Sequence, residues 1–161
     1  MADWLSSIGF QFEQADWFTR IVIALIAGAI LGIDREVRHR RIGIRTYMMV
    51  SLGAAIFAIV SVEMSMDMTA LGLSADPTRV IQGVIGGLGF LGAGAIIQGD
   101  QRVGGMVTAA SLWVAGAIGL SAGMGYGAFA ITCAVLAAAL LAVSRVMEHR
   151  GADDRPDMDR D

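Results

Sequence analysis

The feature that most constrains this chain is a run of 42 consecutive residues, Val103–Ser144, without a single Asp, Glu, Lys or Arg. Two shorter uncharged runs cover Val80–Gly99 and Thr46–Val62. Charged residues make up 17% of the chain, whereas a soluble domain usually carries about a quarter. Because a helix needs about 20 mostly apolar residues to cross a bilayer, these runs predict an all-α, polytopic membrane protein. The composition argues against a soluble enzyme, a nucleic-acid binder or a disulfide-stapled secreted domain.

The number of crossings follows from the lengths of these runs. A single helix formed by the longest run would reach about 63 Å, roughly twice the 30 Å hydrocarbon core. This run must therefore fold back, and the glycines of residues 123–127 mark the turn. A four-helix arrangement is the alternative, because this turn is tight and weakly marked. We expect five helices, at about residues 17–33, 46–62, 80–98, 106–122 and 128–144.

Three parts of the chain follow from this assignment. Residues 17–145 form the predicted transmembrane domain. Residues 1–16 are predicted to lie at the outer face, either as a short interfacial helix or as a frayed tail, because their apolar residues recur at near-helical spacing. Residues 146–161 are predicted to be a disordered, charged cytoplasmic tail, because they are too polar to bury.

The distribution of arginine predicts the orientation. All twelve basic residues are Arg, and a five-span chain places ten of them on one side. Only Arg20, which can snorkel from the first turn of its helix, and Arg79 remain on the other side. The positive-inside rule then puts the C-terminus in the cytoplasm and the N-terminus outside. The Arg-rich segment 34–45 is also expected to attract anionic lipid headgroups.

Glycine is the second unusual feature, with 21 residues that fall mostly within the predicted spans. Helices in lipid associate through small residues that let backbones approach closely, so we expect glycine-rich close packing. The third predicted helix bears glycines on two faces and is expected to be central; a helix broken there around an ion is the alternative. Its GxGxxG pattern at residues 87–92 lacks the strand and acidic residue of a dinucleotide site. The predicted packing glycines are Gly28, Gly32, Gly83, Gly86, Gly87, Gly89, Gly92, Gly94, Gly119 and Gly123.

Polar residues that could carry chemistry lie mainly at the ends of the spans. Asp34 and Arg45 either pair to clamp the first two helices or remain solvated. Asp76 is predicted to cap the third helix, and Gln82 could hydrogen-bond to a neighbouring helix. No carboxylate lies deep in a span, so a cation site formed by this chain alone is poorly supported and no cofactor is expected. Enzymatic activity is disfavoured, because no nucleophile lies beside a base in a recognisable setting.

Six short motifs, taken in order, resemble the MgtC/SapB family of bacterial inner-membrane proteins. They lie at residues 28–36, 43–46, 53–57, 76–80, 89–94 and 108–113, and the resemblance extends from about Ala24 to Met147. The functional or structural candidates within or beside these motifs are Asp34, Arg35, Glu36, Gly43, Arg45, Thr46, Asp76, Arg79, Gln82, Thr108, Ser111 and Trp113.

The resemblance implies a five-helix domain of the bacterial inner membrane with its C-terminus inside. It also implies a link to magnesium limitation and virulence, and in some members restraint of the proton-translocating ATP synthase. The leading hypothesis is a non-enzymatic regulator that acts through helix–helix contacts with a membrane partner such as ATP synthase. A small transporter or channel subunit for Mg²⁺ or another ion and a membrane assembly scaffold are the alternatives. We expect a homo-oligomer, with a dimer as one option.

Overall fold

The computed structural model of this chain describes residues 3–37, 42–97 and 104–153, with side chains outside the description at residues 3–15, 34, 97 and 144–153. All regular structure in these ranges is helical, and no strand occurs among them. This confirms the predicted all-α fold. The five helices are α1 (Asp3–Val37), α2 (Ile44–Ala70), α3 (Thr78–Ile97), α4 (Met106–Gly123) and α5 (Gly127–Asp153).

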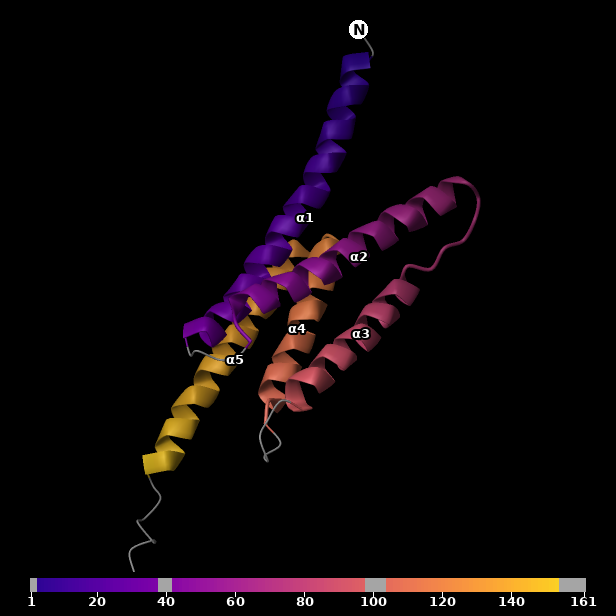
Figure 1. The fold of residues 1–161 in the computed structure, drawn as a ribbon. Coiled ribbons are helices and arrows are strands. Elements are labelled where there is room, and N and C mark those ends of the chain that lie inside the picture. Colours follow the sequence, from indigo (N-terminus) through magenta and orange to yellow (C-terminus); the bar gives the residue numbers. More distant parts are fainter. Residues whose placement is uncertain (1–2, 38–41, 98–103, 154–161) are drawn as a thin grey trace, which may run out of the picture.

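Three of the helices are longer than the uncharged runs indicated. The N-terminal part of α1 continues the first span as one helix and projects beyond the other helices (Figure 1). Helix α2 runs past the expected end at Val62 to Ala70, and α5 runs past Ser144 to Asp153. An uncharged run marks only the part of a helix that lipid surrounds, whereas the helical hydrogen bonds continue where charged side chains reach water.

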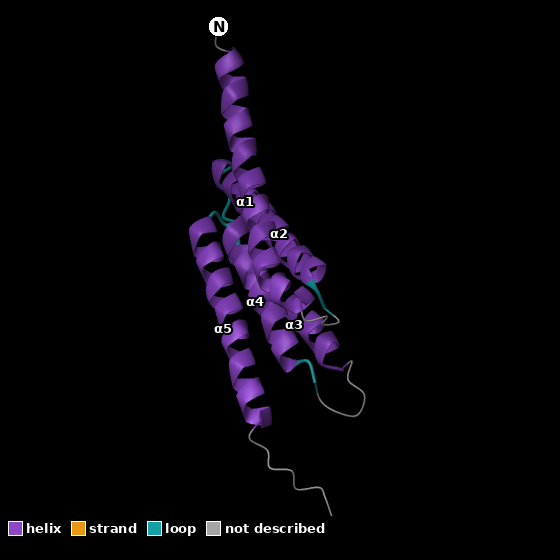
Figure 2. Cartoon of the chain, turned by 90° about the vertical axis from the view of Figure 1, so that its left-hand side faces the viewer, coloured by secondary structure: helices purple, strands orange, loops and turns teal. Residues whose placement is uncertain are grey.

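Helix α4, not α3, is the central helix of the bundle. It contacts each of the other four helices, whereas among the described helices α3 contacts only α4 and, weakly, α2. Figure 2 shows α5 and α3 on opposite sides of α4. The prediction that α3 is approached closely from both sides is therefore wrong within this chain. Glycine content alone could not identify the central helix. Glycine allows another helix to pack closely, but it does not show whether another helix of this chain lies there.

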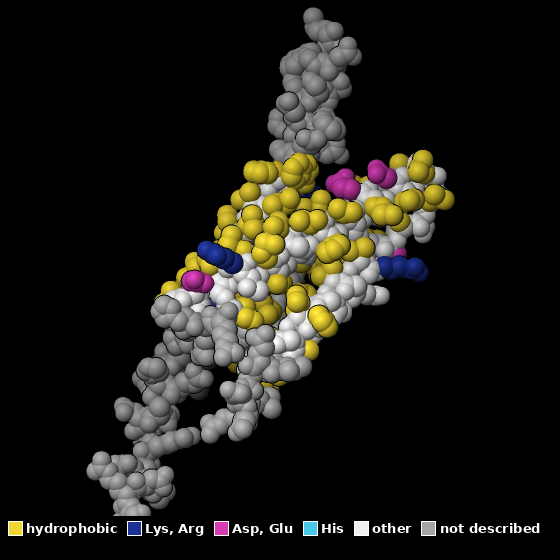
Figure 3. Space-filling model, in the orientation of Figure 1, with side chains coloured by type: hydrophobic (Ala, Val, Ile, Leu, Met, Phe, Trp, Pro, Cys, Tyr) yellow, Lys and Arg dark blue, Asp and Glu magenta, His cyan; other side chains and the backbone are white. Residues whose placement is uncertain are grey.

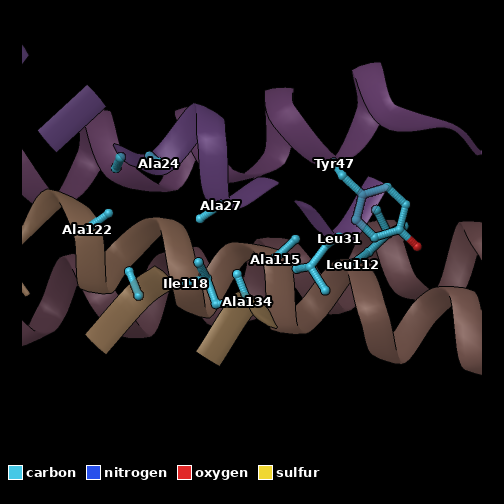
Figure 4. Packing of buried hydrophobic residues seen from close by; sticks show 11 residues of the cluster. Ala24, Ala27, Leu31, Tyr47, Leu112, Ala115, Ile118, Ala122 and Ala134 are labelled. Carbon is cyan, nitrogen blue, oxygen red and sulfur yellow. The ribbon is translucent and has the colours of Figure 1, made fainter. Parts of the chain in front are cut away.

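The core is built from small side chains. Ten of the sixteen buried apolar residues in the described part of the chain are Ala. Alanines of α1, α4 and α5 meet in the middle of the bundle, and Leu31, Tyr47 and Leu112 fill one end of it (Figure 4). Because the Ala methyl group is short, the helix axes approach closely, which is how helices associate in a solvent as apolar as their own side chains.

The surface of the bundle is apolar, as lipid requires. Phe90, Leu71 and Leu140 are each more than 70% exposed. Hydrophobic side chains cover the middle of the molecule in Figure 3, with charged side chains toward its ends. Among the described residues, four segments are long and apolar enough to cross a membrane, at Asp16–Val37, Ile44–Ala70, Thr78–Ile96 and Met106–Gly123. The apolar part of α5, Gly127–Val143, is shorter, so the fifth crossing stays a prediction.

Candidate functional site

Two glycines of α1 set the distance between α1 and α2. A Cβ atom built at Gly28 would lie 2.8 Å from the Tyr47 carbonyl oxygen, and one at Gly32 would lie 2.5 Å from the Ile44 Cα. Both contacts are with backbone, which cannot move aside as a flexible side chain could. These two predicted packing glycines therefore bring the first two helices together directly.

Helix α4 packs against α2 in the same way. Cβ atoms at Gly119 and Gly123 would collide with the carbonyl oxygens of Ser51 and Ala55. A third glycine that the sequence interpretation passed over, Gly116, faces the side chain of Leu88 on α3. The signal for Gly116 was its spacing, three residues before Gly119 on α4, which places the two on one helix face.

Buried hydroxyl groups join the three helices of the core. The Ser51 hydroxyl donates to the Ala24 carbonyl oxygen at 2.8 Å, which links α2 to α1. Tyr47 Oη and Ser111 Oγ lie 2.5 Å apart, linking α2 to α4, and Ser111 Oγ also donates to the Thr108 carbonyl oxygen at 2.9 Å. Because a hydroxyl group has one proton, Tyr47 is the donor to Ser111. Each of the three hydroxyl protons therefore has an acceptor.

Glu36 caps the start of α2. Its carboxylate Oε2 accepts a hydrogen bond from the Ile44 backbone N–H at 3.1 Å. A side chain at Gly43 would occupy the position of this carboxylate oxygen. The negative charge lies at the positive end of the α2 dipole, where it is favourable. The pair Glu36 and Gly43, both predicted candidates, thus ties the end of α1 to the beginning of α2.

Arg35, the residue before Glu36, is buried with two of its nitrogens unpartnered among the described residues. It is 5% exposed. Its Nε and Nη2 atoms are buried and have no hydrogen-bond partner among the described residues. Arg45 is exposed. The Asp34 side chain lies outside the described part of the chain, so the predicted pairing of Asp34 with Arg45 stays a prediction.

The opposite end of the bundle holds a second set of polar contacts. Arg20 forms a salt bridge with Asp16 and donates from Nη1 to the Gly123 carbonyl oxygen at 3.2 Å. Its positive charge thereby stabilises the C-terminal end of the α4 dipole. The sequence indicated only that Arg20 would snorkel, and this contact was missed. The Ser61 hydroxyl donates to the Pro77 carbonyl oxygen at 3.2 Å, joining α2 to the start of α3.

Asp76 caps α3, as its sequence position indicated. Its Oδ1 accepts from the Thr78 hydroxyl at 2.6 Å and from the Thr78 backbone N–H at 2.9 Å. These two hydrogen bonds, with a smaller contribution from the charge of Arg79, hold the pKa of the exposed Asp76 carboxyl below its ordinary value of 3.8. The cap lies in the loop outside the membrane-spanning segments.

The exposed face of α3 borders two apolar hollows. One, of about 750 Å³, lies between α2 and α3 and is lined by Thr46, Gly53, Phe57, Gly83, Gly87 and Phe90, among others. The other, of about 540 Å³, lies between α3 and the α4–α5 turn and includes Trp113 and Tyr126. Both are lined almost entirely by hydrocarbon.

Five of the predicted packing glycines face open space within the described part of the chain. Cβ atoms at Gly83, Gly86, Gly87, Gly89 and Gly94 would meet nothing within 4 Å. A Cβ atom at Gly92 would make an ordinary contact of 3.7 Å with the Ala109 methyl group on α4. Gln82 is exposed on α3 and makes no hydrogen bond to a described residue, so its bond to a neighbouring helix stays a prediction.

Comparison with known proteins supports the motif resemblance. The profile of the MgtC family matches residues 21–150. The chain belongs to the MgtC family.

Three relatives show how much of this MgtC-family chain is shared. YhiD of Escherichia coli (strain K12), named as a proposed magnesium transporter, is 34% identical over 137 residues, which cover 84% of this chain and 64% of YhiD. SrpB of Synechococcus elongatus is 37% identical over 123 residues, covering 70% of this chain and 67% of SrpB. MgtC of Salmonella typhimurium (strain LT2) is 35% identical over 127 residues, covering 78% of this chain and 52% of MgtC. The chain thus spans about half to two thirds of these relatives, and no solved structure matches it.

The candidates of this MgtC-family chain fall into separate groups. Glu36 and Gly43 meet at the start of α2, and Thr108 and Ser111 are connected to α2 through Tyr47. Asp76 and Arg79 lie at the start of α3, whereas Trp113 is 45% exposed. Tyr47 was missed because it stands in an uncharged run, where nothing in the sequence distinguishes a buried hydroxyl group from a lipid-facing one. No group of three or more potential metal ligands occurs among the described His, Cys, Asp and Glu side chains.

Proposed function

We propose that this MgtC-family protein is a non-enzymatic regulator of the bacterial inner membrane that contacts another membrane protein when magnesium is limiting. The family membership and the name of the relative YhiD support the link to magnesium. ATP synthase is the candidate partner that the motif resemblance suggests. Because the chain spans only part of the relatives it matches, this activity is proposed for it and not transferred.

The observation that carries the proposal is the uncovered glycine surface of α3. Glycine lowers helix propensity by about 1 kcal/mol relative to Ala. Packing against lipid chains does not offset this loss of helix stability, because lipid chains pack equally well against Ala or Leu. Packing against a second helix does offset the loss, because a glycine surface lets the two backbones approach closely. Gly83 and Gly87, four residues apart, lie open on the α2–α3 groove and fit a transmembrane helix of the partner.

Ion conduction by this chain alone has less physical support. The segments 21–33, 44–62, 78–97 and 106–143 contain no Asp or Glu, and Mg²⁺ prefers carboxylate oxygens and retained water. The groove beside α3 is lined by apolar side chains that would exclude a hydrated ion. An oligomeric transporter subunit, which the name of YhiD favours, remains the second candidate function.

The partner can be captured by photocrosslinking in magnesium-starved cells. A photoreactive residue replaces Phe90, which lines the groove and is 81% exposed, and in a control it replaces Leu140 on α5, which is 71% exposed. We expect one dominant adduct from position 90 that mass spectrometry identifies, and no such adduct from position 140. Equal adducts from both positions would reject the proposal.

A transport measurement separates the two candidate functions. The full chain is reconstituted in liposomes loaded with a Mg²⁺-sensitive dye. A regulator should give the same influx as empty vesicles, whereas influx well above that control would establish the transporter subunit instead.

A further inference from the structure

One arginine of the described part of the chain, Arg35, is buried with two hydrogen-bond donors unused. Arg35 is 5% exposed, and its Nε and Nη2 atoms are both inaccessible and unpartnered among the described residues. A buried charge is costly unless it is paired and hydrogen-bonded. An ionisable group held at the end of a membrane span without a partner is therefore a candidate binding site.

The geometry of the unused donors narrows what they can bind. Nε–H and the neighbouring Nη2–H project from the same edge of the planar guanidinium group. Two parallel N–H donors on one edge form the fork that holds a carboxylate or phosphate group through two hydrogen bonds. The unpaired donors of Arg35 are thus the two that together recognise an oxyanion.

The described polar groups at this end of the bundle have other partners. Glu36, the neighbouring carboxylate, accepts from the Ile44 N–H at the start of α2. Tyr47, Ser111 and the Thr108 carbonyl group bond to one another. Arg20, the other arginine of the α1 span, differs from Arg35. Its two terminal nitrogens bind Asp16 and the Gly123 carbonyl oxygen, and only its Nε has no acceptor.

Charge and depth favour a phosphate group over the carboxylate of a protein partner. Segment 34–45 carries five Arg against Asp34 and Glu36, a positive field that gathers phosphate-bearing anions at a membrane surface. Arg35 stands two residues before the end of the apolar segment Asp16–Val37, at the level where that segment leaves the hydrocarbon and lipid phosphates lie. We propose that the Arg35 guanidinium binds a phosphate group, which anionic lipid headgroups and free phosphate both present.

This site is tested by the thermal stability of the purified full chain in nanodiscs. Wild type is compared in discs of a phosphate-free galactolipid, in the same discs with added inorganic phosphate, and in galactolipid discs that also contain phosphatidylglycerol. Native mass spectrometry of each sample counts the retained lipid. A gain in Tm with phosphatidylglycerol alone identifies a lipid phosphate, and a gain with inorganic phosphate identifies the free anion. No gain in either arm overturns the proposal and leaves a protein carboxylate as the counter-ion.

Two variants separate the site from general attraction by the basic segment. Arg35→Gln should weaken retention of the phosphate species about tenfold, the effect of losing charge-assisted hydrogen bonds. Arg45→Gln, an exposed position with the same change in charge, should retain it almost unchanged. Equal losses in the two variants would overturn the proposal. If Arg35→Gln does not fold, Arg35→Lys is used instead, because it keeps the charge but not the two parallel N–H donors. Undiminished retention of the phosphate species in Arg35→Lys would also overturn the proposal.

Discussion

At the scale of single residues, the structure separates glycines that are required from glycines that are merely present. The carbonyl oxygen of Ser51 occupies the place of a side chain at Gly119, whereas open space surrounds Gly86. Both are glycines within apolar helices and look alike in the sequence. Their difference lies wholly in which backbone faces them.

Replacement of Gly119 tests this difference. Gly119→Ala should lower the free energy of unfolding by about 1–3 kcal/mol, because α2 and α4 must move apart to admit the methyl group. Gly86→Ala, the matched control, should leave stability unchanged or raise it by up to about 1 kcal/mol through helix propensity. Thermal unfolding in detergent measures both. Equal effects would show that the α2–α4 contact is looser than described.

The Tyr47–Ser111 hydrogen bond is also a property of individual residues. Tyr47→Phe should cost about 1 kcal/mol, because the bond joins two buried groups on different helices. Ser111→Ala should cost a similar amount, and the double variant should cost less than the sum of the two. A double-mutant cycle of unfolding free energies measures the coupling, and strict additivity would contradict the bond.

At the scale of elements, the ends of the helices are held by different devices. Helix α2 begins with a carboxylate from another helix, because Glu36 of α1 reaches across Gly43 to the Ile44 N–H. Helix α3 begins with a local cap from Asp76, two residues before Thr78. The local cap was readable from the order of Asp76, Pro77 and Thr78. The cap of α2 was not, because it depends on how α1 and α2 approach each other.

The Asp76 cap makes the start of α3 sensitive to acid. The pKa of Asp76 is lower in the folded protein than its ordinary value of 3.8, so its stabilisation is present above the unfolded pKa. That stabilisation is lost as the pH falls through the lower folded value. Hydrogen exchange in the first turn of α3 should therefore show less protection at about pH 2 than at about pH 6, after correction for intrinsic rates. Asp76→Asn retains an acceptor that does not titrate, and persistence of the same pH dependence in that variant would refute the assignment.

At the scale of the whole molecule, four helices surround α4, which contacts each of them. The charge-free runs predicted the number and approximate positions of these helices, because any backbone in lipid must satisfy its own hydrogen bonds. They did not predict the arrangement. Helices that are apolar on every side have no distinct face to orient them, so α3 was placed centrally although it lies at the edge.

The orientation in the membrane is a prediction for the whole molecule. Single cysteines are introduced at Arg45 and at Ser74, in the α2–α3 loop, with the native Cys133 replaced by Ser. An impermeant thiol reagent applied to intact spheroplasts should label position 74 and spare position 45, as the arginine distribution predicts. Labelling of both positions from outside, with the membrane shown to be sealed, would refute a crossing by α2.

The sequence by itself determined that lipid surrounds the middle of this protein, where its helices lie, and how α3 is capped. Each of these depends on composition or on residues adjacent in the chain. Only the tertiary structure decided that α4 is central and that Gly28, Gly32, Gly119 and Gly123 touch opposing backbones. It also decided that Nε and Nη2 of Arg35 are buried with no acceptor among the described residues. The physical reason is that lipid and protein interiors are equally apolar. Hydrophobicity therefore cannot tell which side of a helix meets another helix, and only the packed arrangement of helices does.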